Sequence, residues 1–183
     1  ADAWVAVHLD KYVSTVKSDS IVTKPKGDDR LILVHSSRLD TLSFRSVKEY
    51  GVAKESTQIA FIGEGCDSLN LSYVKCHDII QSETHLIAED SLLFSNISIS
   101  EQGDQVAFLL SRDTCDYKNY ELCYATVGKS GYRAVVDSTD NNIHQGMAPS
   151  IHSKPLFSKD GSKLFFGTAP LVKEEKKDSL LSN

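Results

Sequence analysis

The string Gly-Lys-Ser-Gly-Tyr at 128–132 places a serine and a lysine between two glycines, the residue types of two catalytic loops. A serine hydrolase presents its nucleophile in a G-x-S-x-G turn, and a P-loop holds phosphate with GxxxxGK[ST]. The first pattern fails because Gly131 follows Ser130 directly. The second fails because Cys123 stands where its first glycine would be. The string lies between two predicted strands, so we expect a hairpin turn there.

Histidines and carboxylates are the other groups that could do chemistry. No two of the histidines have the HxxxH or HExxH spacing of a zinc site. The six are His8, His35, His77, His85, His144 and His152. His144 and His152 share a long polar loop and could reach a neighbouring domain. Glu101, Asp104 and Asp160 fall in predicted turns, where carboxylates commonly accept hydrogen bonds from backbone amides. We predict no catalytic, cofactor-binding or metal-binding residue in the chain.

The four cysteines are too few for a disulfide scaffold, and none forms CxxC. Cys76 and Cys123 each lie 15 residues after a repeated phenylalanine, so we expect equivalent positions on the third strands of successive repeats. Buried, free thiols are the simpler interpretation of this pair. The alternative is two disulfides, Cys66–Cys76 and Cys115–Cys123. Against it, Cys66 and Cys115 fall near hairpin ends, while their partners lie well along a strand.

Composition narrows the class of protein. The chain has 183 residues, 40% of them hydrophobic, which suits one domain or a piece of a larger one. Its net charge is −5 and its basic residues are scattered, so we predict no nucleic-acid partner. No apolar run approaches the roughly 18 residues of a membrane span. The chain opens on the strand-like ADAWVAVHL without a methionine, and we expect it to be part of a longer protein.

A ten-residue pattern recurs along the chain. It reads VAKESTQIAF at 52–61, ISEQGDQVAF at 99–108 and FSKDGSKLFF at 157–166, with a partial copy in DAWVAV at 2–7. Each copy is an apolar residue, a polar turn and a strand that ends in Phe, as expected of a tight hairpin. The final phenylalanines are 47 and 58 residues apart. Periods of about 40–50 residues with several strands each are typical of propeller blades.

Strand signals divide each repeat further, through alternation and β-branched or aromatic content. They are 3–9, 30–36 and 41–47; 49–53, 58–63, 70–76 and 82–88; 95–100, 104–111, 119–127 and 132–138; and 154–159 and 163–168. Polar stretches at 11–29 and 138–153 are interpreted as loop insertions. We predict an all-β fold, a partial β-propeller of about three and a half four-stranded antiparallel blades. The units are 1–48, 49–93, 94–153 and 154–170, with a tail at 171–183.

The repeated turn resembles the WD40-like repeats of bacterial TolB-type propellers, in which an apolar-Ser-x-Asp-Gly turn precedes an aromatic-ending strand. Phe157–Gly161 matches this pattern fully, Ile99–Gly103 less well and Val52–Ser56 in outline. A narrower resemblance covers most of the chain. The order KPKGDDRLILVHSS, LSFRSVKEYGVAKESTQIAF, ISEQGDQVAFLLSRDT, YELCYATV and FSKDGSKLFFGTAP is similar to the N-terminal propeller of prolyl oligopeptidase-family serine peptidases of Bacteroidetes type. LFFGTAP is its most specific segment.

This resemblance implies the non-catalytic propeller portion of an exported, periplasmic serine peptidase. Its partners would be a C-terminal α/β-hydrolase domain and the peptide substrate, whose access the propeller would gate, and it implies no cofactor. A TolB-like periplasmic protein-binding module is the alternative. A third hypothesis is a sugar- or polymer-active propeller, which would need carboxylates converging on the central channel.

Overall fold

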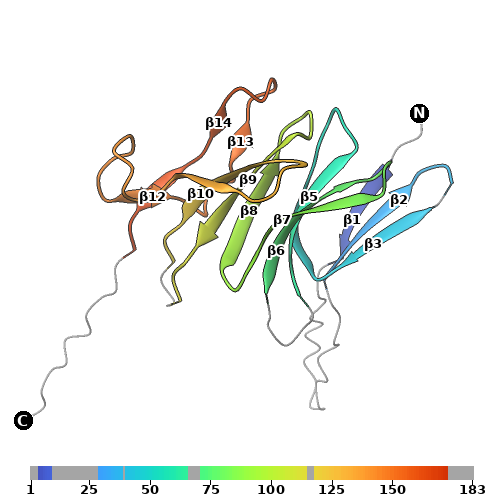
Figure 1. Ribbon diagram of the computed structural model, residues 1–183, viewed down its shortest axis with the longest axis horizontal. Helices are drawn as coiled ribbons and strands as arrows, with labels where there is room; N and C mark the ends of the chain where they lie inside the picture. Colours follow the sequence, from blue (N-terminus) through green and yellow to red (C-terminus); the bar gives the residue numbers. More distant parts are fainter. Residues whose placement is uncertain (1–3, 10–28, 39, 66–70, 115–117, 173–183) are drawn as a thin grey trace, which may run out of the picture.

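The computed structural model describes residues 4–9, 29–38, 40–65, 71–114 and 118–172, and within these ranges the regular structure is β-strand. The strands form a row of antiparallel sheets that follows the chain from its N-terminal sheet to β12 (Figure 1). The first sheet has the order β1-β2-β3: Trp4–Leu9, Arg30–His35 and Thr41–Arg45. These strands lie where the sequence predicts them.

Two four-stranded meanders follow the first sheet. The second sheet is β4 (Val47–Val52), β5 (Gln58–Glu64), β6 (Ser72–Asp78) and β7 (Glu83–Asp90). The third is β8 (Leu93–Ile99), β9 (Gln105–Ser111), β10 (Glu121–Thr126) and β11 (Arg133–Val136). Sequence neighbours pair throughout, which is the strand order of a propeller blade.

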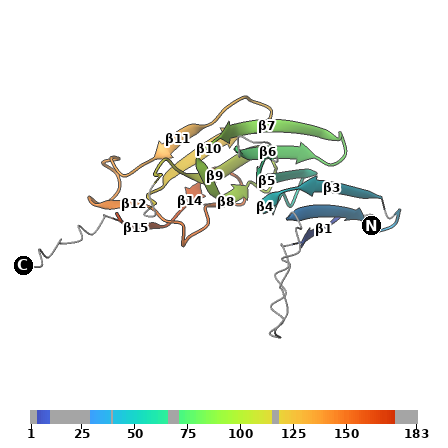
Figure 2. The same cartoon turned by 90° about the horizontal axis from the view of Figure 1, so that it is seen from below.

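The second strand of each meander is covered on both faces. In β5 and β9 almost every residue is buried, with no alternation between inside and outside. A strand reads as a continuous apolar run when both faces of its sheet are packed, and IAFI and VAFLL are such runs. The sheets therefore stack face to face, with the first and third sheets on opposite sides of the second (Figure 2).

Three apolar clusters fill the spaces between successive elements. Between the first two sheets lie Leu31, Leu33, Val47, Ile59, Phe61 and Tyr73, with Phe44 and Trp4 packed against them. Between the second and third sheets lie thirteen buried residues, among them Val74, Cys76, Phe94, Ile97, Phe108 and Cys123. Leu109, Tyr120 and Leu122 pack with Leu164 and Phe166 beyond the third sheet. Each sheet is thus bound to the next by side chains from both.

The repeated turns also contact one another from sheet to sheet. Gly103 has φ +79°, and a Cβ there would lie 2.8 Å from Cβ of Gln58, at the start of β5. Gly161 has φ +68°, and its Cβ would lie 2.6 Å from Nε2 of Gln105, at the start of β9. Gln58 and Gln105 occupy the same column of the repeat. Each turn glycine therefore packs on the glutamine of the preceding unit.

Serine and aspartate side chains close the same turns. The Ser158 hydroxyl donates to Asp160 at 2.6 Å and accepts from the Lys163 amide at 2.9 Å. Asp160 also accepts from the Ser162 amide at 3.1 Å, as the sequence predicts for a turn carboxylate, and these bonds lower its pKa to about 2. Ser100 has the equivalent role, since its hydroxyl accepts from the Gln105 amide at 3.1 Å.

The fold is a partial β-propeller. The first strands of successive sheets lie together, with β8 against β4 and against the short strand β13 (Leu156–Phe157). β8 also crosses β5 and β6 of the second sheet. Alignment of first strands along one line, with later strands fanning outward, is the arrangement of blades around a propeller axis.

The last repeat departs from the predicted pattern. The expected strands at 154–159 and 163–168 are reduced to β13 and β14 (Leu164–Phe165), two residues each. The prediction of a loop over all of 138–153 is wrong, because β12 (Met147–Pro149) pairs with β15 (Thr168–Pro170). The two ladders belong to one long hairpin, interrupted where Pro155 and the turn before it add residues to one arm. A proline has no N–H to donate to a ladder.

Substituting Gly103 by alanine tests the contact between turns. We expect Gly103→Ala to lower the free energy of unfolding by about 2–5 kcal/mol, because left-handed strain of about 1–2 kcal/mol adds to overpacking of about 1–3 kcal/mol. Equilibrium unfolding in urea measures this loss of stability.

Gly128→Ala is the matched control for this substitution. Gly128 has the same φ of +79°, but a Cβ there would meet nothing within 4 Å. Gly128→Ala should lower the free energy of unfolding only by the left-handed backbone strain, about 1–2 kcal/mol. Equal losses in the two variants would contradict packing of Gly103 on Gln58.

Candidate functional site

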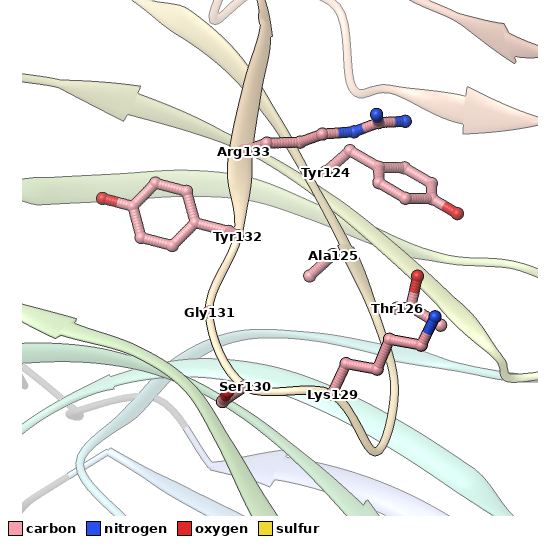
Figure 3. Close-up of a pocket in the computed structure, with 8 residues that line it drawn as sticks. All are labelled: Tyr124, Ala125, Thr126, Lys129, Ser130, Gly131, Tyr132 and Arg133. Carbon is pink, nitrogen blue, oxygen red and sulfur yellow. The ribbon is translucent and has the colours of Figure 1, made fainter.

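A hollow of about 410 Å³ lies at the β10–β11 hairpin and is lined by eight residues. They are Tyr124, Ala125, Thr126, Lys129, Ser130, Gly131, Tyr132 and Arg133 (Figure 3). The string at 128–132 thus forms the turn of this hairpin, as the sequence predicts. Gly128 and Gly131 both have positive φ, which a tight reversal between the strands requires.

The register of the hairpin sets the geometry of this hollow. Tyr124 is the cross-strand partner of Arg133, and the Arg133 guanidinium lies over the tyrosine ring, 5.2 Å from its centre. Figure 3 shows both side chains on the same side of the hairpin as Lys129, with Tyr132 pointing to the other. The Tyr124 hydroxyl donates to Oε1 of Gln105 at 3.1 Å, which fixes the ring.

Chemically, the hollow can attract an anionic or aromatic group. Lys129 and Arg133 supply two cations, and none of the lining residues carries a carboxylate. Lys129, Ser130 and Arg133 are exposed, however, so their charges are screened by solvent. The hollow also belongs to the outer strands of the third sheet, whereas β8 is the strand next to the propeller axis. Its position is peripheral.

A second hollow, of about 290 Å³, lies where β9 ends and β10 begins. Here Nε of Arg112 donates to Glu121 at 3.0 Å, and this contact raises the pKa of Arg112. The Asn119 amide N–H donates to Asp113 at 2.7 Å, and the Asn119 side chain bonds both the N–H and the carbonyl of Val172. The polar groups around this hollow are paired with one another. The Asn119–Val172 hydrogen bonds among them connect the end of the last hairpin to the third sheet.

The histidines are dispersed, and among the described residues no group of three His, Cys, Asp or Glu is placed to hold a metal ion. His144 donates to the Gln145 carbonyl at 2.9 Å in the polar segment before β12, and His152 is exposed in the loop after it. His85, on β7, is 3.9 Å from Glu83. His8, His35 and His77 lie at the boundary between the first two sheets.

The structure corrects the equivalence predicted for Cys76 and Cys123. Both are buried and free, but Cys123 pairs across the ladder with Phe108, whereas Cys76 pairs with Ala60. The ladder partner of Phe61 is Lys75. A one-residue difference in register turns a side chain to the opposite face. The two thiols therefore enter the same core cluster from opposite sheets.

The chemical state of these thiols follows from their burial. Desolvation raises the pKa of each to about 12, and the Cys76 S–H donates to Oε1 of Gln58 at 3.2 Å. A thiol that stays protonated is a poor nucleophile, so both behave as core side chains. Cys66 and Cys115, the partners in the alternative disulfides, lie outside the described residues.

Most of the aromatic side chains of the repeats are packed between sheets. Phe61, Tyr73, Phe108, Tyr120 and Phe166 belong to or pack on the core clusters. Tyr124 contacts Phe157 at a ring distance of 6.5 Å. Phe165 is 56% exposed, because β14 turns it away from the third sheet together with its ladder partner Leu156.

The chain is similar to parts of solved structures at low sequence identity. One is the tricorn protease, with 15% sequence identity and a TM-score of 0.49 over 75% of this chain. Another is the β-propeller domain of the trilobed protease from Pyrococcus furiosus, which has an open velcro topology, with 8% identity and a TM-score of 0.38 over 67% of this chain. The chain spans 13% of the first protein and 51% of the second.

No protein-family model matches the chain, and no curated protein matches it.

In the described part of the chain, no helix has the length and hydropathy needed to cross a membrane. The assignment as a partial propeller rests on the strand order, the stacked sheets and the aligned first strands.

Thiol labelling tests the burial of the two cysteines. We expect Cys76 and Cys123 to resist alkylation in the native protein at pH 8 and to react once urea unfolds it, because burial keeps both protonated. Peptide mass spectrometry assigns the label to each cysteine separately. Rapid native labelling of either residue would contradict its place in the core.

Proposed function

We propose that this chain is the non-catalytic β-propeller part of an exported prolyl oligopeptidase-like serine peptidase. In this role the propeller controls which peptides reach a C-terminal α/β-hydrolase domain of the same protein. The main support is the repeated FSKDG-type turn, whose copies stack from sheet to sheet through Gly103 and Gly161, together with the LFFGTAP segment that resembles such peptidases.

The shape of the fold agrees with a gating role. A propeller surrounds a central channel, and its first strands are the ones nearest to it. Here β4, β8 and β13 are those strands, and their turns are fixed to one another by close glycine contacts. A peptide that passes the channel would meet these strands rather than the hollow at the β10–β11 hairpin. In this role the channel selects the peptides, and none of the described residues takes part in the hydrolysis.

Activity measurements on two proteins test this assignment. The 183-residue chain alone should not hydrolyse chromogenic prolyl peptides or react with a fluorophosphonate, because it has no G-x-S-x-G nucleophile turn. The full-length protein should do both. Clear turnover by the short chain would contradict the non-catalytic role. A full-length protein without the nucleophile turn would instead favour a TolB-like binding module.

Gating predicts a dependence on substrate size. In the full-length protein, Gly103→Ala should raise kcat/KM for long peptides by a larger factor than for dipeptide substrates, because it loosens the contact between neighbouring turns. Gly128→Ala leaves that contact intact and serves as the control. The same change for short and long peptides would exclude a gating role for these blades.

A further inference from the structure

The boundary between the first two sheets contains imidazole rings among apolar side chains. His8 on β1 donates through Nε2 to the Val47 carbonyl at 2.8 Å, which links the first strand of one sheet to that of the next. His35 on β2 packs edge-on against Trp4, with ring centres 5.1 Å apart. His77 on β6 packs against Phe44 of β3, with ring centres 4.9 Å apart. Three of the six histidines thus lie at one boundary of the row.

The surroundings of His77 are unfavourable for a charge. It is 4% exposed, and its Nε2 is buried without a hydrogen-bond partner in the described part of the chain. Its Nδ1 lies 2.8 Å from the Thr84 hydroxyl. Whichever ring nitrogen holds the proton in the neutral form, the imidazolium would bury an N–H⁺ on Nε2 with no acceptor. An unpaired buried charge costs several kcal/mol or forces the surrounding structure to open.

The groups that face His77 do not offset this cost. Its ladder partners are Ile59 on β5 and Thr84 on β7, and Phe44 covers it from β3. Asp78 is adjacent and favours protonation, but its side chain bonds Thr57, Gln58 and the amides of the β6–β7 turn on the other side of the strand. Lys75, two residues away on the same face of β6, opposes a second positive charge. Burial is the largest effect, and the pKa of His77 is lowered from 6.5.

We propose that the boundary between the first and second sheets is an acid-sensitive joint, in which protonation of His77 releases β1–β3 from the second sheet. On the opposite side of the second sheet the histidine is His85, the ladder partner of Cys76, and unlike the buried His77 it is partly exposed and lies 3.9 Å from Glu83. Acid therefore separates the row at one defined place.

The pH window follows from the direction of the shift. Because the docked state holds His77 with a lowered pKa, the undocked state binds the proton first as pH falls. Docking is at full strength above pH 6.5 and weakens progressively below it. The change thus falls in the range between about pH 5 and 8, where histidine alone changes charge in most proteins.

Trp4, the only tryptophan of the chain, reports on this joint because it packs in the boundary cluster. As pH falls from about 8 to 5, its emission should shift to the red and acrylamide should quench it more strongly. Amides of β1–β3 should lose protection from hydrogen exchange while those of the third sheet keep it. His77→Gln, which cannot be protonated, should abolish the pH response.

Three further variants separate the possible causes. His85→Gln removes a partly exposed histidine from β7 and should leave the response unchanged. His35→Gln removes any direct quenching of Trp4 by a neighbouring imidazolium, so a remaining red shift reports undocking. His77→Phe is the second neutral variant, in case the glutamine is not tolerated.

Two results would overturn the proposal. One is a pH response of Trp4 that persists in both His77 variants. The other is an ordinary titration of the His77 ring near pH 6.5 in the wild-type NMR spectrum, without a change in β1–β3. The NMR titration decides the matter even where a variant fails to fold.

Discussion

Burial of both faces of each sheet is the requirement from which the rest of the structure follows. In β5 and β9 the side chains of both faces are apolar, so the second and third sheets each need a neighbour on either side. Face-to-face stacking supplies these neighbours, and it brings the repeated turns together along one rim. At that rim a Cβ in place of Gly103 would overlap Ser56 and Gln58, and one in place of Gly161 would displace the end of the Gln105 side chain. Each end of the row exposes some apolar side chains, among them Val5 and Phe165.

Much of this arrangement could be predicted from the sequence, because its signals are local. The ten-residue pattern combines a turn and an apolar strand, and each part has its own residue preferences. The strands at 58–63 and 104–111 were predicted, like the others, from alternation and from β-branched or aromatic content. Spacing of the repeats then grouped the strands into units. The last hairpin was harder, since Pro149, Pro155 and the polar residues near them weaken every strand signal there.

Register was the feature that the sequence could not supply. Cys76 and Cys123 are equally spaced from the repeated phenylalanines, yet their side chains lie on opposite faces of their sheets. The connection between the two strands decides the register, and its length does not appear in the repeat pattern. The hollow beside Tyr124 depends on register in the same way. Arg133 reaches the Tyr124 ring because the two are cross-strand partners next to the turn, and the bulge between Leu122 and Cys123 shifts the ladder only beyond them.

The chemical character of the boundaries differs along the row. The core between the second and third sheets contains two thiols whose pKa is raised to about 12, so its charge does not change near neutral pH. The boundary before it contains His77, whose charged form has no acceptor. Both boundaries are similarly apolar at pH 7, and they respond differently only when protons become available. In a row of similar blades, a single buried side chain can therefore make the packing at one boundary depend on pH while the packing at the next does not.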